Sequence, residues 1–156
     1  MTTPVFPASL WRRLAALMYD GLLLCALLFV TAGVLSPLFI WLGLPTDTVN
    51  GVLVPNRLVQ QTLTFPLLCL LVWGFYTWFW THGGQTLGMH TWRLRAVRSS
   101  GAPMGWRHST LRMLAGMLTW MLLGLGYLPV LLGKPALHDW LSGTRVVLLP
   151  AKPKRR

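Results

Sequence analysis

The residue best placed to do chemistry is Asp20, a carboxylate inside a long apolar run. It lies seven residues after Arg13, a rise of about 10 Å along a helix, and so well inside the hydrocarbon if the run crosses a membrane. A charge at the bilayer centre costs roughly 2.5 to 3.5 kcal/mol, and such side chains therefore face an interior partner or water. Asp20 is then either a site for a cation, a proton or a polar solute, or half of a buried ion pair, for example with Arg112.

Arg13 and Asp20 share one face of the expected helix. Their spacing is too long for a direct contact along that helix, but both can meet the same neighbouring element. Ala16 lies between them on this face, and a small residue leaves room for a close approach by another segment.

A second acid, Asp139, follows the last apolar run. It is near enough in sequence or expected position to pair with Arg12, Arg13 or Arg145. Ion pairs at a membrane surface mostly serve packing, and we therefore favour a structural role for Asp139.

The other residue patterns in the chain indicate neither a metal-binding site nor an enzyme active site. The histidines lack a metal-ligand spacing such as His-x-x-x-His, and no Cys lies near them. No Ser/His/Asp set, paired carboxylates or cofactor motif is present. The glycine-rich stretch 83–88 lacks the Gly-Lys-Ser/Thr of a phosphate loop and is expected to form a turn. We expect no catalytic residue, no metal and no cofactor.

The elements that must position these residues are membrane helices. Of the 156 residues, 54% are hydrophobic and 11% are charged, where about 25% charged is usual in soluble proteins. Three apolar runs, at 14–35, 62–80 and 113–133, meet the length of about 20 residues that a membrane span requires. The third contains Gly124, Gly126 and Pro129, which can interrupt a helix and turn it back.

Two short segments outside these runs are predicted to form β-strands. Residues 91–98 alternate apolar and polar side chains before a turn, and residues 143–149 are rich in β-branched side chains. If the two strands pair, they must lie on the same face of the membrane. The predicted fold is thus an all-α integral membrane protein. It is a small helical transmembrane bundle with two full spans, a third hydrophobic segment that spans or forms a re-entrant hairpin, and short cytoplasmic β-strands.

The distribution of basic residues indicates the orientation. The chain has 14 Lys and Arg against three acids. Three full spans would place equal numbers of basic residues on the two sides. A third run that turns back places 13 of the 14 on one side, leaving only Arg57 on the other. Basic loops stay in the cytoplasm, and we therefore expect a multi-pass protein of a bacterial-type inner membrane with its N-terminus in the cytoplasm.

The positions of the basic residues also indicate which partners the chain has. The basic residues flank apolar runs, which favours contact with anionic lipid headgroups at the loop 82–112 and the C-terminal tail, and we expect no nucleic acid. A chain with so few helices encloses a pathway most easily as a homo-oligomer or with another membrane protein.

The stretch 11–20, Trp-Arg-Arg-Leu-Ala-Ala-Leu-Met-Tyr-Asp, resembles the opening of RDD family membrane proteins, which are named for one arginine and two aspartates. The resemblance continues through residues 84–88, 94–97, 111–112 and 138–147. It covers about 8–148, an RDD-like transmembrane domain, and leaves 149–156 as a basic tail. Met89 and His90 depart from the basic pair usual in similar proteins.

By position, the resemblance matches the family arginine to Arg13 and its aspartates to Asp20 and Asp139. The resemblance implies transport of ligands that are not known for the family, with cation/proton exchange proposed for some members. We therefore expect transport of a small cation, a proton or another small solute through a site centred on Asp20. The alternative is a non-catalytic membrane scaffold or assembly factor, in which the charged residues only fix helix packing and topology.

Overall fold

The computed structural model describes residues 6–150 and divides the chain into two compact units. The first unit contains residues 6–21 and 75–150 of the described chain, and the second contains residues 22–74. Each unit is described by itself below.

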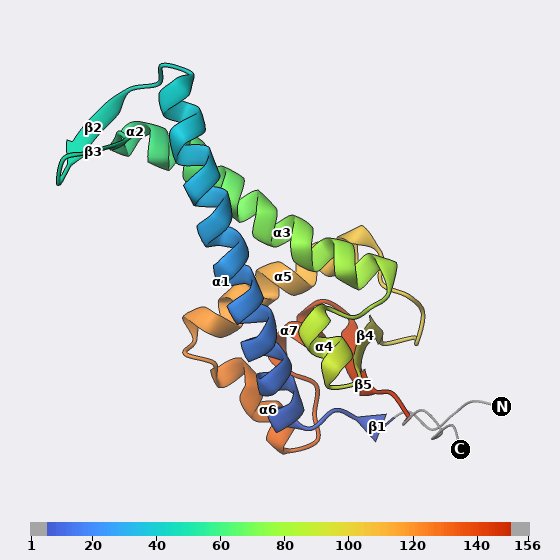
Figure 1. The fold of residues 1–156 in the computed structure, drawn as a ribbon. Helices are drawn as coiled ribbons and strands as arrows, with labels where there is room; N and C mark the ends of the chain where they lie inside the picture. The colour runs from blue at the N-terminus through green and yellow to red at the C-terminus, as the bar shows by residue number, and fades with distance from the viewer. Residues whose placement is uncertain (1–5, 151–156) are drawn as a thin grey trace, which may run out of the picture. The chain divides into compact units, whose positions relative to one another are not determined.

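Within the described residues, two helical stretches are long and apolar enough to cross a membrane. The first is α1 (Leu10–Trp41), which continues through Pro37 beyond the predicted run (Figure 1). The second extends over Arg57–His82. It comprises α2 (Arg57–Val59), the π-helical turn η1 (Gln60–Thr64) and α3 (Phe65–His82).

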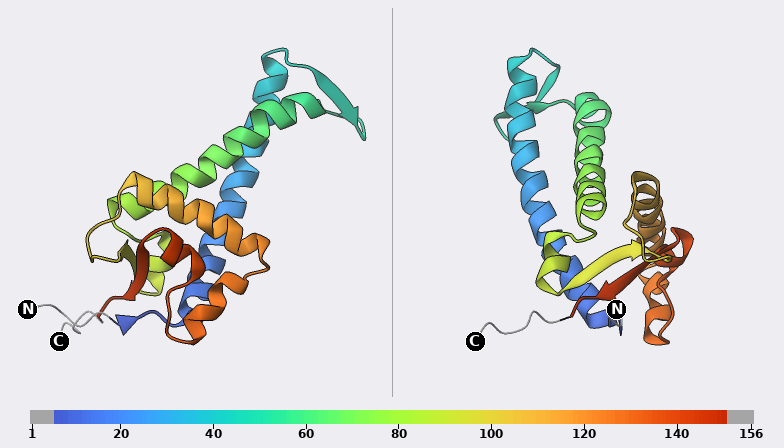
Figure 2. Two further views of the ribbon diagram at one scale, coloured as in Figure 1. Left: turned by 180° about the vertical axis from the view of Figure 1, so that it is seen from behind. Right: turned by 90° about the vertical axis from the view of Figure 1, so that its right-hand side faces the viewer.

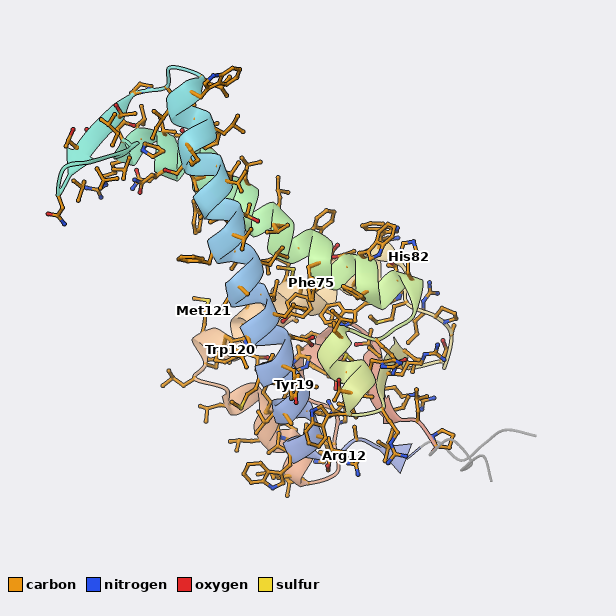
Figure 3. All side chains as sticks on the ribbon, viewed as in Figure 1. Arg12, Tyr19, Phe75, His82, Trp120 and Met121 are labelled. Carbon is orange, nitrogen blue, oxygen red and sulfur yellow. The ribbon has the colours of Figure 1, made fainter. Side chains whose placement is uncertain are left out.

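The outer faces of the helices are apolar and uncovered. Phe29 of α1 is 83% exposed and Trp41 is 81% exposed. In the first unit Tyr19, Trp120 and Met121 are also exposed (Figure 3). Such continuous apolar surface is unstable in water and is the surface that lipid covers. The chain is thus a multi-pass membrane protein, as predicted.

The third apolar run is broken. Helix α5 (Trp106–Met121) is followed by a 3-10 turn, η2 (Leu125–Tyr127), and by α6 (Leu128–Leu131). The chain bends by 118° between Trp106–Met121 and Leu125–Leu131, the geometry of a broken span or a re-entrant loop. At the break Leu123 and Gly124 both have positive φ, 51° and 80°, a conformation that glycine adopts without strain. The predicted interruption near Gly124 is confirmed, although α5 begins earlier than the predicted run.

The predicted strands pair in a small sheet in the first unit. Its order is β1 (Phe6–Pro7), β5 (Thr144–Leu148) and β4 (Leu94–Arg98), all antiparallel, with Ala96 opposite Val146 (Figure 2). Short helices precede the two longer strands, α4 (Leu87–Thr91) and α7 (Leu137–Leu141). The inner face of the sheet helps to form the core of this unit, whose buried members are Ala8, Ala16, Trp80, Met89, Leu94, Ala96, Met104 and Val146.

A hairpin in the second unit was not predicted. Strands β2 (Thr46–Val49) and β3 (Val52–Pro55) pair antiparallel. They are joined by Asn50 and Gly51, both with positive φ. An Asn-Gly pair between short strands is a strong hairpin signal. The all-α expectation with two strands is therefore corrected to a helical fold with five short strands among the described residues.

Candidate functional site

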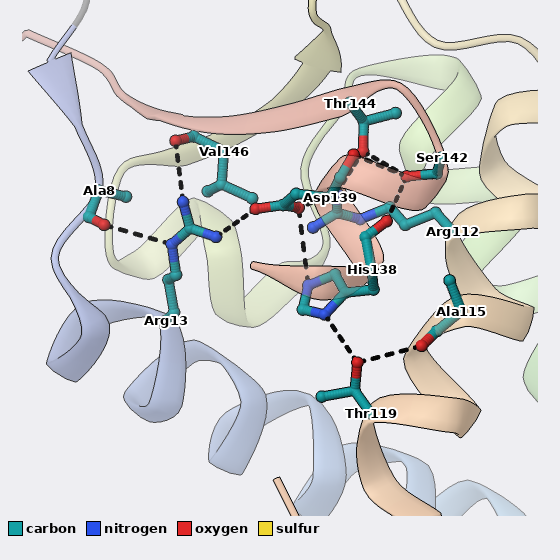
Figure 4. A network of polar contacts seen from close by, with 10 residues as sticks. All are labelled: Ala8, Arg13, Arg112, Ala115, Thr119, His138, Asp139, Ser142, Thr144 and Val146. Carbon is teal, nitrogen blue, oxygen red and sulfur yellow. Dashed lines mark hydrogen bonds and ion pairs between the residues drawn. The ribbon is translucent and has the colours of Figure 1, made fainter. Parts of the chain in front are cut away.

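A buried carboxylate, Asp139, lies between two arginines from different helices. Asp139, in α7, has no exposed surface. Nη1 of Arg13 in α1 donates to Oδ2 of Asp139 at 2.5 Å, and Nη1 of Arg112 in α5 donates to Oδ1 (Figure 4). One side chain therefore ties together three segments that are far apart in sequence.

Arg13 has an acceptor for each nitrogen of its guanidinium group. Besides the bond to Asp139, its Nε donates to the carbonyl of Ala8 at 3.2 Å, and its Nη2 donates to the carbonyl of Val146 at 3.4 Å. The Val146 carbonyl belongs to β5. Arg13 thus joins the first turn of α1 to both the sheet and α7.

Arg112 approaches the same carboxylate from α5. Its Nη1 also donates to Oγ1 of Thr144 at 2.6 Å, and its guanidinium carbon lies 5.1 Å from the centre of the Trp80 ring. This distance is within the range of a cation–π contact. The Nε atom of Arg112 is buried without a partner among the described residues.

Polar side chains from α5 and α7 complete the network. Ser142 Oγ donates to the carbonyl of His138 at 2.5 Å and lies 2.7 Å from Oγ1 of Thr144. Nδ1 of His138 lies 3.5 Å from Oγ1 of Thr119. The hydroxyl of Thr119 in turn donates to the carbonyl of Ala115 (Figure 4).

The network carries one excess positive charge at neutral pH. Burial lowers the pKa of His138 to about 4, and the charge of Arg112 acts in the same direction. Burial alone would raise the pKa of Asp139, but Arg112 and Arg13 outweigh it and hold that pKa at about 2. His138 is therefore neutral, and two guanidinium groups face one carboxylate.

Asp20 lies in a different environment in the same unit. It is 4% exposed, and its two oxygens accept from neutral groups. Oγ1 of Thr86 donates to Oδ2 at 2.5 Å, and the backbone N–H of Gly88 donates to Oδ1 at 2.8 Å. Thr86 is also the N-cap of α4, where its hydroxyl accepts from the N–H of Met89 at 3.2 Å. In the described part of the chain, no side chain forms an ion pair with Asp20.

The contact between Asp20 and α4 depends on Gly88. A Cβ atom at this position would lie 3.0 Å from Cγ and Oδ1 of Asp20, and closer still to the carbonyl oxygen of Ala16. Ala16 is itself 2% exposed. The close approach predicted beside Ala16 is thus confirmed, with the backbone of α4 as the approaching segment.

The structure changes some of the predicted pairings. Arg13 pairs with Asp139, which was one of the three pairings predicted for this acid. The pairing of Asp20 with Arg112 is wrong, because Thr86 and Gly88 enclose the carboxylate of Asp20 while Arg112 reaches Asp139. The ion pairs of Asp139 are buried inside the protein and do not lie at the membrane surface, where the sequence had led us to expect them.

The other two candidate partners of Asp139 do not reach it. No ion pair involves Arg12 or Arg145 among the described residues. Arg145 is on β5 with its side chain exposed, whereas the neighbouring Thr144 and Val146 are buried. Alternation along the strand thus directs Arg145 away from the network.

The sequence did not indicate the roles of the polar residues around the two acids, among them Thr86, Gly88 and Thr144. A local signal existed for the first, since Thr immediately before a short apolar segment is a typical N-cap. Gly88 and Thr144 gave no such signal, because their roles come from contacts with distant segments.

The two buried acids differ in the chemistry that their surroundings allow. No group of three or more His, Cys, Asp or Glu that could hold a metal occurs among the residues described. The carboxylate of Asp20 can accept a proton or a small cation, because no arginine or lysine of residues 6–150 pairs with it. Asp139 is already neutralised by arginines, and its role is to hold the network together.

The chain matches the model of a known protein family. The model of the RDD family matches residues 7–143, a range that includes Arg13, Asp20 and Asp139. No curated protein and no solved structure matches the chain.

Proposed function

Since the chain belongs to the RDD family, we propose that it is an inner-membrane protein that moves a proton, a small cation or another small solute. We place the transport site at Asp20.

The observation that carries this proposal is the environment of Asp20. It is a buried carboxylate in an apolar helix, and both of its hydrogen-bond donors are neutral. A buried carboxylate without a cationic partner is costly in its charged form, and binding a proton or a cation removes that cost. Such a group changes its charge more readily than Asp139, which two arginines hold ionised.

The network around Asp139 has a supporting role in this proposal. Arg13 and Asp20 lie on one face of α1, and Arg13 is fixed by Asp139, Ala8 and Val146. Holding the first turns of α1 in this way keeps Asp20 against the turn at Thr86.

The proposed topology follows from the sheet. Strands β1, β4 and β5 belong to one sheet, and they come from before α1, after α3 and after α6. Paired strands cannot lie on opposite sides of a bilayer. This favours two full spans and a third segment that returns to its starting side. The side is the cytoplasm by the distribution of basic residues. A reporter fused after Arg156 and another near Ser99 should both score cytoplasmic, and a periplasmic score for either contradicts the topology.

The transport proposal is tested in proteoliposomes. Cation flux driven by a pH gradient is measured for the wild type, Asp20→Asn and Asp47→Asn. Asp47 is the matched control because it is an exposed acid in the hairpin of the other unit. A flux that Asp20→Asn leaves unchanged removes Asp20 from the mechanism.

A second candidate is a membrane scaffold or assembly factor. The close approach of Gly88 to Asp20 and to Ala16 favours it, because such a junction also fixes packing. In this case the basic loop and tail would contact anionic lipid or a partner membrane protein. If Asp20 serves packing alone, Asp20→Asn lowers the abundance of folded protein. If it serves transport, abundance is kept and flux is lost.

A further inference from the structure

Arg112 has an unused hydrogen-bonding edge inside the protein. Both hydrogen bonds that it makes to described residues leave from Nη1, to Asp139 and Thr144. Its Nε is buried without an acceptor, and the residue as a whole is 5% exposed. Arg13, by contrast, has an acceptor for each guanidinium nitrogen. The Nε and Nη2 edge of an arginine is a fork that fits two oxygens of one carboxylate or phosphate.

No acid of the chain is left to fill this edge. The sequence has three acids, Asp20, Asp47 and Asp139. Asp139 is shared between two arginines, Asp20 is held by Thr86 and Gly88, and Asp47 is exposed on a hairpin of the other unit. One buried positive charge therefore has no counter-charge, which costs several kcal/mol unless an anion is bound.

Two further donors without acceptors lie beside Arg112. The ring of Trp80 lies beneath the guanidinium group, and its Nε1 is buried without a partner. Ser109, one helical turn before Arg112, is fully buried, and its hydroxyl also has no partner among the described residues. A cluster that offers N–H and O–H groups and an excess positive charge fits a ligand that only accepts hydrogen bonds.

We propose that Arg112, Trp80 and Ser109 form a binding site for a small oxyanion, either a carboxylate or a phosphate. The ligand occupies the Nε and Nη2 edge of Arg112 and accepts from the indole N–H and the serine hydroxyl. The oxyanion comes either from solution or from a lipid phosphate. This site is separate from Asp20 and does not depend on the transport proposal, because Arg112 pairs with Asp139 and not with Asp20.

The site is tested by thermal unfolding of the detergent-solubilised, delipidated protein. Acetate, inorganic phosphate and a short-chain phosphatidic acid are added in turn, with sodium chloride at equal ionic strength as the control. A ligand that binds the folded state and not the unfolded state stabilises the folded protein. The midpoint of thermal unfolding should therefore rise by a few degrees. A rise with acetate or phosphate assigns a free oxyanion, and a rise with phosphatidic acid alone assigns a lipid phosphate. No rise beyond that of chloride overturns the proposal.

Variants separate this site from other anion effects. Trp80→Phe keeps the ring beneath Arg112 and removes the N–H, and Ser109→Ala removes the hydroxyl. Ser109→Ala should not lower the midpoint without oxyanion, because its hydroxyl has no acceptor among the described residues. Trp80→Phe also shrinks a core side chain and should lower that midpoint somewhat. The oxyanion response of each variant is therefore measured from its own midpoint without ligand. Each should weaken oxyanion binding by roughly tenfold, the worth of one hydrogen bond to a charged group.

Two comparison variants complete the design. Trp78→Phe, at an exposed position of the same helix, should leave the oxyanion response intact. Arg112→Lys keeps a positive charge for Asp139 but lacks the fork, and should lose the response. If that variant does not fold, Trp80→Phe and Ser109→Ala still decide the question. An oxyanion response that is unchanged in either of those two variants overturns the proposal.

Discussion

Arg13, in the first turn of α1, donates a hydrogen bond of 2.5 Å to Asp139, although 126 positions separate the two residues. The second oxygen of the same carboxylate accepts from Arg112 of α5. Because all three side chains are buried, the carboxylate of Asp139 and not water offsets the charge of the two guanidinium groups, and one positive charge is left over. The stability of the first unit should therefore depend strongly on this one carboxylate.

Asp139→Asn should destabilise the protein strongly. The substitution leaves two buried guanidinium groups without a counter-charge, which costs roughly 3 to 5 kcal/mol. The free energy of unfolding in detergent measures the effect. Asp47→Asn, at an exposed position, should change it by less than about 0.5 kcal/mol. Equal effects of the two substitutions would show that the buried network does not stabilise the fold.

Arg13→Lys should also destabilise, although it keeps the charge. A lysine ammonium cannot reproduce the planar set of bonds to Asp139, Ala8 and Val146. We expect a loss of about 1 to 3 kcal/mol. Arg12→Lys, at the neighbouring position outside the network, is the control and should be within about 0.5 kcal/mol of the wild type. An equal loss of stability in Arg12→Lys and Arg13→Lys would contradict a stabilising role of the bonds made by Arg13.

Gly88→Ala should disrupt the contact between α4 and α1. The added Cβ would press on the carbonyl of Ala16 and on the carboxylate of Asp20, and overpacking of this kind costs about 1 to 3 kcal/mol. Gly116→Ala is the matched control, because it lies in α5 with open space around the new Cβ. That change should stabilise the helix by up to about 1 kcal/mol. Thermal unfolding of both variants should therefore give shifts of opposite sign.

Stability should fall on acidification in two steps. The pKa of His138 is lowered from 6.5 to about 4 in the folded protein, and the unfolded chain therefore takes up a proton first. The contribution of neutral His138 is complete above pH 6.5 and is lost as the pH falls towards 4. The pKa of Asp139 is lowered from 3.8 to about 2, and its contribution is lost between those values.

The first of these steps can be isolated with His138→Gln. The variant should show a smaller fall in the free energy of unfolding between pH 6.5 and 4 than the wild type. The second step, below pH 3.8, should remain in the variant. An identical pH profile of the two proteins would exclude His138 as the titrating group.

Much of the helical architecture could be predicted because lipid imposes a simple pattern. Long apolar runs identify the spans, and the glycines near residue 124 identify the break. Helix ends were less predictable. Helix α1 continues through Pro37, and α5 begins seven residues before its apolar run, at Trp106. Polar residues at a helix end are compatible with either a helix or a loop, and tertiary contacts decide.

The candidate site could be predicted only in part. Arg13, Asp20 and Asp139 stand out because charges are rare in this chain. Their partners did not stand out, because Asp20 is satisfied by a hydroxyl and a backbone N–H. Backbone donors carry no side-chain signal in a sequence. The choice between Arg12, Arg13 and Arg145 as partners of Asp139 likewise depends on where α5 and α7 pack, which charge counting does not specify. The same packing brings Arg112 to Asp139 and not to Asp20.

The most direct test of the proposed transport site is the pH-gradient-driven cation flux per folded protein in proteoliposomes. The wild type and Asp47→Asn should give equal initial rates. Asp20→Asn should reconstitute in equal amount and reduce the rate to that of protein-free liposomes. A rate for Asp20→Asn equal to the wild type, with both proteins folded, would contradict the assignment of Asp20 as the transport site.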